Sequence, residues 1–313
     1  MNTSWGEVDV CDAHIHFFSH GFYCSIAAQK NDLSLSASHP DPAGAVARIL
    51  NWDAPPPDPE GLAEIWAREL DRCGVSRAAL IASIPGDEAS VAAAVAAFPD
   101  RFHGYFMVNP LAAGALERVE GALSAGLQGL CFFPAMHRYS MNDPRVEPIL
   151  QAASTRAGIV IFVHCGVLTV GIRSKLGLGS PFDMRYSNPI DLHPMALLHP
   201  RLNFVVPHFG AGYLREALML CDMCPNVHLD TSSSNAWMRY YAPALDLKQV
   251  FSRALDVAGP TRLLFGTDSS FFPRGWQEPV FSSQARALAD LGVSKADAQA
   301  ILGGNFDRLL SRG

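Results

Sequence analysis

Two histidines and an aspartate alternate at the end of the first apolar stretch, "VDVCDAHIHFF", which spans residues 8–18. Side chains two residues apart in a strand point to the same side, so His14 and His16 can bind one ion together. Imidazole nitrogens combined with a carboxylate oxygen suit zinc, and also manganese or iron. A coordination position left open to water would lower the pKa of that water toward neutrality and supply hydroxide. The pattern therefore indicates metal-dependent chemistry.

Further residues of metal-ligand type end three later apolar stretches. His164 ends "IVIFVH", His208 ends "LNFVVPH" and Asp268 ends "RLLFGTD". Taken singly, a histidine in a strand is typical of a hydrogen-bonded core residue, and an aspartate in this position can cap the segment that follows. Their joint occurrence with His14 and His16 predicts that all five side chains converge on one rim of the fold.

The elements that position these residues alternate between strand and helix. Apolar stretches such as "RAALIASI", "FHGYFMVNP" and "LQGLCFFP" are each followed by a helix-forming segment, and the opening strand brings the strand–helix units to eight. This alternation indicates a parallel sheet of the α/β class, and eight units indicate a (β/α)8 TIM barrel, whose active site lies at the carboxyl ends of the strands. We expect one domain over residues 1–313, with a long loop at 20–59 after the first strand.

Composition and charge argue against other classes. Of the 313 residues, 49% are hydrophobic and 17% are charged, which suits a large core and not a disordered chain. A net charge of -6 without a basic run argues against nucleic acid as a partner. No apolar stretch reaches the roughly 18 residues that a membrane helix needs, and no signal peptide is recognisable, so we expect no membrane partner and a cytoplasmic location.

Cysteine usage points the same way. Seven scattered cysteines fit reduced thiols in the cytoplasm. The one C-x-x-C pair, Cys221 and Cys224, falls late in an expected helix and has no second pair, so it is a weak signal for a zinc or redox site.

The chain resembles the amidohydrolase superfamily of metal-dependent barrels, and within it the branch of aminocarboxymuconate-semialdehyde decarboxylase. The resemblance rests on "DAHIH", "FVHCG", "PHFGAG", "LLFGTDSSFFP" and "ILGGNFDRLL", which are spread over nearly the whole chain. It implies a homodimer, and it implies that His208 stands beside the metal-bound water, where it orients the water or polarises the substrate. The metal ligands that it implies are His14, His16, His164 and Asp268.

One departure from the superfamily bears on the number of ions. Its two-metal members place a carboxylated lysine at the end of the fourth strand, where this chain has Cys131 and Phe132 in "LQGLCFFP" and neither lysine nor glutamate. We therefore expect one divalent ion, zinc with manganese as the alternative, and we interpret Cys131 as a buried thiol. We expect Asp12 to support the ligands and not to bind the ion. We expect Asn305 to cap a helix or to pack.

The residues suggest both a mechanism and a substrate class. Asp268 would accept a proton from the activated water and pass it to the leaving group, while His208 stabilises the charge that develops on the substrate. Arginine and aromatic residues in the loops after strands five, seven and eight suit a small carboxylate-bearing or aromatic substrate. We predict Arg173 and Arg239 as substrate contacts. The loops also carry Lys175, Arg185, Trp237, Tyr240 and Arg274.

Three functions fit these residues. The first is hydrolysis of an ester, lactone, amide or activated carbon–carbon bond. The second is decarboxylation, without oxidation, of an aromatic or muconate-like acid, which uses the same ligands and is known in the same branch. The third is a barrel that binds a ligand without catalysis, and the complete donor set argues against it. Release of carbon dioxide without uptake of water would distinguish the second from the first.

Overall fold

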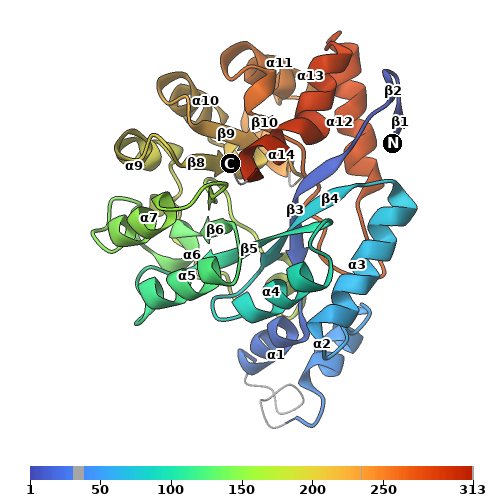
Figure 1. The fold of residues 1–313 in the computed structure, drawn as a ribbon, viewed down its shortest axis with the longest axis vertical. Helices are drawn as coiled ribbons and strands as arrows, with labels where there is room; N and C mark the ends of the chain where they lie inside the picture. The colour runs from blue at the N-terminus through green and yellow to red at the C-terminus, as the bar shows by residue number, and fades with distance from the viewer. Residues whose placement is uncertain (31–38, 234, 312–313) are drawn as a thin grey trace.

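A ring of parallel strands forms the centre of the computed structural model, which describes residues 1–30, 39–233 and 235–311. Eight strands pair in chain order, from β3 beside β4 to β9 beside β10 (Figure 1). Beyond β10, Ser269 bridges back to Ile15, and its carbonyl oxygen accepts a 2.8 Å hydrogen bond from the His16 amide. These contacts close the ring and confirm the predicted barrel. The strands are β3 (Cys11–Phe17), β4 (Arg77–Ala82), β5 (Phe102–Val108), β6 (Gly129–Phe132), β7 (Val160–Val163), β8 (Asn203–Val206), β9 (Val227–Asp230) and β10 (Leu263–Leu264).

Helices surround the ring of strands (Figure 1). Capping residues define their ends, as in α3, where Asp58 accepts a hydrogen bond from the Gly61 amide and Gly74 ends the helix at φ 71°. The helices that follow the eight strands are α3 (Pro59–Cys73), α4 (Glu88–Ala97), α5 (Ala115–Ser124), α7 (Val146–Ser154), α9 (His193–Leu198), α10 (Leu214–Met223), α11 (Leu247–Val257) and α12 (Glu278–Asp290). Shorter elements are β1 (Asn2–Thr3), β2 (Gly6–Glu7), α6 (Pro134–His137), α8 (Gly171–Lys175), α13 (Lys295–Gln299) and α14 (Asn305–Leu310).

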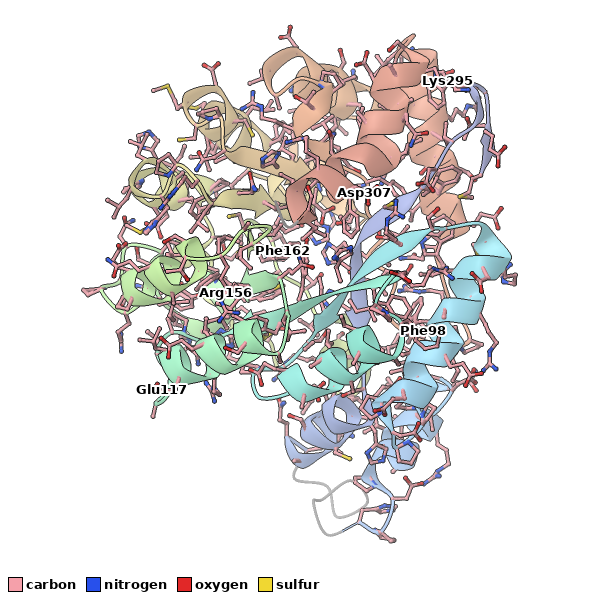
Figure 2. All side chains as sticks on the ribbon, in the orientation of Figure 1. Phe98, Glu117, Arg156, Phe162, Lys295 and Asp307 are labelled. Atoms are coloured by element: carbon pink, nitrogen blue, oxygen red, sulfur yellow. The ribbon has the colours of Figure 1, made fainter. Side chains whose placement is uncertain are left out.

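The apolar core has an inner and an outer part. The outer part lies between strands and helices, while the inner part fills the ring with side chains such as Ile81 and Phe162. Figure 2 labels Phe162 near the middle of the ring and Glu117, on α5, at the periphery. Phe306 of α14 joins the inner part, and Asp307 pairs at 2.6 Å with Arg77, the first residue of β4. The carboxy-terminal helix therefore covers the amino end of the ring and leaves the carboxyl ends of the strands for the site.

The segment after β3 is long, as predicted, but its described part is not an irregular loop. It contains α1 (His20–Ala28) and α2 (Pro42–Leu50), which project beyond the ring at the lower edge of Figure 1, while residues 31–38 lie outside the described ranges. The two helices form a separate apolar cluster that includes Phe22 and Val46, and Ile172 of α8 packs into it. The helix α1 buries Phe22, Tyr23 and Ile26, so its sequence lacks the 3.6-residue period that predicts a surface helix. The helix α2 is buried along most of its length and exposes Arg48 and Ile49.

All seven cysteines are free thiols, and Cys221 and Cys224 are both buried. In the described part of the chain, no helix combines the length and the hydropathy that crossing a bilayer requires.

Candidate metal centre and active site

Three predicted ligands meet at the carboxyl end of β3. A register irregularity between Asp12 and Ile15 in the pairing with β4 accompanies the turn of both His14 and His16 toward the site. Their Nε2 atoms lie 3.4 Å apart. The Oδ1 oxygen of Asp268 lies 3.7 Å from Nε2 of His14 and 3.4 Å from Nε2 of His16. All three ligand atoms lie within 4.8 Å of one another, which is the spacing of donors around one ion.

The hydrogen bonds of the other ring nitrogens determine which nitrogens carry lone pairs. The hydroxyl proton of Ser83 is donated to the Ile81 carbonyl at 3.0 Å, so the 2.8 Å bond between Ser83 and His16 is donated by Nδ1 of the histidine. His14 likewise donates from Nδ1 to Oδ2 of Asp230 at 2.7 Å. Both Nε2 atoms therefore present lone pairs, as metal-binding histidines do.

Charge also favours a cation at this point. Burial opposes ionisation of Asp268, but its contact with His16 and the nearby His14 and His208 rings hold the pKa of its carboxyl well below the usual range. Burial alone would lower the pKa of His14, yet the carboxylates of Asp230 and Asp268 on either side raise it. Two imidazole nitrogens and one ionised carboxylate that face one another at this spacing fit a divalent ion.

His164 and His208 lie in the same site but outside this group of three. The ring of His164 follows β7, stacks on Phe133 with centroids 5.5 Å apart, and lies 5.4 Å from the ring of His208. Burial holds the pKa of His164 well below its usual value, so the ring is neutral at pH 7 and can bind a metal. Its Nδ1 atom is buried and has no hydrogen-bond partner within the described residues. The structure thus places His164 beside the centre: its ring neighbours that of His208, which lies 5.1 Å from the ring of His14.

Ser232 joins His14 to His208. Its Oγ lies 3.0 Å from Nδ1 of His14 and 2.9 Å from Nδ1 of His208. Because Nδ1 of His14 already carries the proton that it donates to Asp230, the Ser232 hydroxyl does not donate to His14. Burial lowers the pKa of His208, so its ring is neutral at pH 7 and has one N–H group and one lone pair. Ser232 therefore fixes the position of the His208 ring relative to His14.

Asp12 joins the first strand of the barrel to the last. Its Oδ1 accepts hydrogen bonds from the backbone amides of His14, at 2.9 Å, and Thr267, at 3.1 Å. Its Oδ2 accepts from the Thr267 hydroxyl and, at 2.7 Å, from Nε1 of Trp276. Four donors occupy the carboxylate, so Asp12 holds the strand that carries His14 and is not one of the converging donors.

The backbone at the site takes conformations that are uncommon outside glycine. His208 and Asp268 have φ angles of 55° and 60°, in the left-handed region. Gly266, two residues before Asp268, lets the backbone pass close to the side chains of His14 and Asp230. A Cβ at this position would lie 2.9 Å from Cβ of His14 and 3.0 Å from Oδ1 of Asp230. Left-handed backbone at non-glycine residues is typical of functional sites, where the surrounding structure must hold it.

A cavity of about 420 Å³ opens beside these residues, a size that suits a small ligand. His16, His164, His208 and Asp268 line it. The helices α1, α2 and α8 form a cap over the cavity, and aromatic and apolar side chains of the cap and of residues packed against it form much of the wall, among them Phe18, Phe22, Trp52 and Ile172. A second hollow of about 480 Å³, between α10 and α11, contains none of the predicted site residues.

The family model described as amidohydrolase matches residues 11–312. The chain belongs to the amidohydrolase family. One curated relative, Protein fluG of Emericella nidulans, is 33% identical to this amidohydrolase over 98 residues. That match covers 31% of this chain and spans 11% of the relative's length.

Solved structures share the fold of this amidohydrolase at low identity. An amidohydrolase from Burkholderia multivorans with bound zinc is 17% identical, with a TM-score of 0.61 and coverage of 97% of this chain and 100% of that one. The 5-carboxyvanillate decarboxylase of Novosphingobium aromaticivorans, with bound manganese, is 15% identical, with a TM-score of 0.61 and 97% coverage of both chains. A probable 2-pyrone-4,6-dicarboxylic acid hydrolase from Acinetobacter baumannii is 14% identical, with a TM-score of 0.58 and coverage of 96% and 99%.

The end of the fourth barrel strand, β6, holds no second set of ligands in this amidohydrolase. Cys131 is buried there, and burial raises the pKa of its thiol well above the usual range, so it stays protonated. Asn305 has a packing role: its amide donates to the carbonyls of Pro260 and Leu263, both at 2.8 Å.

The structure does not bring the two arginines predicted as substrate contacts to the cavity. Arg173 donates to the Gly179 carbonyl at 2.9 Å and to the Gln29 side chain, and Arg239 lies over the ring of Tyr240 at 5.3 Å. Neither is among the residues that line the cavity, where the lysine and the arginine are instead Lys175 and Arg274. Whether a cation in these loops lines the cavity depends on the direction in which its side chain points. The loop sequences do not predict that direction.

Sequence reasoning missed Asp230, Ser232 and Ser83, which fix the rings of the histidines. Asp230 ends β9 and Ser83 directly follows β4. The rule that polar residues at strand ends face the active site applies to both positions and was a usable signal.

Proposed function

We propose that this amidohydrolase is a metal-dependent hydrolase of a small carboxylate-bearing or aromatic substrate that contains an ester, lactone, amide or activated carbon–carbon bond. The observation that carries the proposal is the convergence of Nε2 of His14, Nε2 of His16 and Oδ1 of Asp268 within 4.8 Å, at the wall of a small cavity. His164 would be the fourth ligand, since its neutral ring lines the same cavity.

The side chains divide the work of hydrolysis among them. A divalent ion held by these residues would supply an activated water and a Lewis acid for the substrate carbonyl. Asp268 accepts the proton of the attacking water at its carboxylate and returns it to the leaving group. His208 donates a hydrogen bond from Nε2 to the substrate oxygen on which negative charge develops. Ser232 would donate its hydroxyl proton to Nδ1 of His208, 2.9 Å away, and so keep the ring in the tautomer that this donation needs.

The donor set suits zinc, with manganese as the alternative. Neutral imidazoles and one carboxylate are common ligands of both ions, and three or four protein donors leave a position for water. One ion fits better than two, because Cys131 and its neighbours in β6 offer no bridging carboxylate.

Hydrolysis is tested with a panel of lactones, aryl esters and aryl amides, assayed with purified protein that has been stripped with a chelator and then reloaded with zinc or manganese. We expect turnover of at least one compound class that disappears on stripping and returns on reloading. His208→Gln should lower kcat roughly 100-fold or more while the metal content stays the same. Turnover that survives removal of the metal would contradict the proposal.

Decarboxylation of an aromatic acid is the second candidate. It is favoured by the aromatic cavity wall and by the cations Lys175 and Arg274 that line the cavity. Assays of aryl carboxylic acids in water labelled with ¹⁸O separate the two reactions. A lyase releases carbon dioxide without incorporating label into the organic product, whereas a hydrolase incorporates one oxygen.

We also propose that the protein is a cytoplasmic homodimer with no nucleic-acid or membrane partner. The seven free cysteines suit a reducing compartment. Light scattering coupled to size-exclusion chromatography measures the assembly, and a monomer at micromolar concentration would contradict the dimer.

A further inference from the structure

Two cationic side chains, Lys175 and Arg274, line the cavity. Lys175 ends α8, and Arg274 lies in the loop that follows β10. Within residues 1–30, 39–233 and 235–311 neither forms an ion pair, whereas Arg185, on the loop after β7, is paired with Asp183 at 2.6 Å. The positive charge of Lys175 and Arg274 is therefore available to a ligand, while that of Arg185 is neutralised by its neighbour.

An aromatic pair positions both cations. The rings of Trp52 and Phe271 stack with their centroids 3.6 Å apart. The Arg274 guanidinium carbon lies 4.3 Å from the Phe271 centroid, and Nζ of Lys175 lies 5.1 Å from Trp52 and 5.9 Å from Phe271. Cation–π contacts of this kind orient a positive charge without neutralising it, so the cations remain able to attract an anion.

Arg274 is also fixed close to the metal centre. Its Nη2 donates to Oγ of Ser270 at 2.8 Å and to the backbone carbonyl of Asp268 at 3.3 Å. Nε and Nη1 have no hydrogen-bond acceptor in the described part of the chain. A guanidinium held in this way presents its remaining N–H groups as a planar fork, which matches the two oxygens of a carboxylate.

We propose that Lys175 and Arg274 form a carboxylate-binding subsite, and that they select a planar aromatic or conjugated acid over its neutral analogue. The ligand would place one carboxylate between the two cations and its flat body along the wall that includes Phe133 and Phe18. The inference rests on the proposed function, because the same ligand would present its reacting bond to the centre formed by His14 and Asp268.

The subsite is tested by calorimetric titration of the zinc-loaded protein with two probes of nearly equal shape. Isophthalate carries two carboxylates, and isophthalamide replaces both of them with neutral amides. We expect the wild type to bind isophthalate roughly tenfold more tightly or better. Lys175→Gln and Arg274→Gln should each lose most of that preference, with little change in affinity for isophthalamide. Arg274→Lys keeps the charge but not the planar fork, and should retain part of the preference.

Matched controls come from cations outside the cavity. Arg201→Gln and Lys248→Gln remove the same charges from positions that do not line it, and should bind isophthalate as the wild type does. Thermal melting of every variant verifies folding. Equal affinity of the wild type for the two probes would overturn the inference, and so would unchanged isophthalate binding in both Lys175→Gln and Arg274→Gln.

The test of the carboxylate subsite can fail or succeed independently of the test of hydrolysis. Repeating the titrations on protein stripped of zinc measures the contribution of the cations alone. Loss of the preference in the variants, in a protein that shows no metal-dependent turnover, would support the subsite and contradict the hydrolase. Metal-dependent turnover with equal isophthalate binding in all variants would give the reverse conclusion.

Discussion

The Oδ2 oxygen of Asp230 lies 2.7 Å from Nδ1 of His14, although the two residues are 216 positions apart in the chain. This contact links β9 to β3, which are separated in the ring by β10, and both side chains are buried. It fixes the tautomer of His14, so that Nε2 presents a lone pair toward His16 and Asp268. Carboxylates that orient metal-binding histidines in this way also raise the basicity of the ligand.

Asp230→Asn should therefore weaken metal binding. The amide keeps the size of the side chain but no longer holds a negative charge against the proton on Nδ1, so we expect the affinity for zinc to fall about 10- to 100-fold. Competition with a chromophoric chelator measures the affinity. Asp256→Asn, an exposed residue of α11, is the matched control. Equal zinc affinity in the wild type and Asp230→Asn would show that the contact does not orient a ligand.

Ser232→Ala should lower kcat while the metal content stays close to that of the wild type. Without the hydroxyl, His208 is free to take the other tautomer, which cannot donate from Nε2 to the substrate. We expect a loss of roughly 10- to 100-fold.

The effect of Ser232 must pass through His208. The double variant Ser232→Ala/His208→Gln should therefore be no slower than His208→Gln alone, because residues that act as a unit are not additive. Multiplied losses in the double variant would contradict the shared role.

Gly266→Ala should damage the site and leave the fold intact. The added Cβ would lie 2.9 Å from Cβ of His14 and 3.1 Å from Cβ of Ser232, so the His14 side chain, which binds the metal in this account, must shift. We expect metal affinity and turnover to fall together. Gly121→Ala is the control, since its Cβ meets nothing within 4 Å and alanine favours the helix α5 by up to about 1 kcal/mol. Full activity in Gly266→Ala would show that the site does not need the backbone of residue 266 to pass this close to His14.

Stability should depend on pH through His228, which lies on β9 away from the metal centre. Burial lowers the pKa of this ring to about 3, and the charges of Arg308 and Arg262 add to the effect. Between about pH 6.5 and pH 3 the unfolded chain binds a proton that the folded ring does not, so the free energy of unfolding falls as the pH falls. At pH 5 the loss amounts to about 2 kcal/mol.

His228→Gln removes this contribution. Urea denaturation at pH 8 and pH 5 should show a smaller loss of unfolding free energy in the variant than in the wild type, by about 2 kcal/mol. The comparison at pH 8, where the ring is neutral in both states, corrects for changes in packing. The same loss in both proteins would mean that His228 is protonated in the fold.

The barrel and the origin of its ligands were predictable from the sequence, because both follow from short-range patterns. Apolar strands that alternate with helices specify the parallel ring, and the polar residues that end these strands must meet at one rim. His14, His16 and Asp268 are close together for this reason. Asp230 follows the same rule. From the sequence alone, however, the aspartate that ends "NVHLD" could equally be a capping residue, because its partner His14 is distant in the chain.

The cap and the substrate contacts were not predictable, because they depend on packing between distant segments. The helix α1 buries Phe22, Tyr23 and Ile26, so its sequence shows no polar face. Arg239 and Arg274 both sit beside aromatic residues in loops on the same rim, and only the loop conformations place Arg274 at the cavity.

A second group of metal-ligand residue types provides an internal control for the metal centre. Asp9, Cys11 and Asp307 also approach one another, at the opposite end of the barrel. There Arg77 pairs with Asp9 at 3.2 Å and with Asp307 at 2.6 Å, so a guanidinium already supplies the positive charge. We expect no metal at that end.

Elemental analysis of the purified protein tests the central claim most directly. The wild type should carry about one equivalent of zinc or manganese, and His14→Ala and Asp268→Ala should each lose most of it. Asp9→Ala, at the opposite end, should retain the metal. A wild type that binds no divalent ion even after incubation with excess zinc, or alanine variants that bind as much as the wild type, would contradict the account.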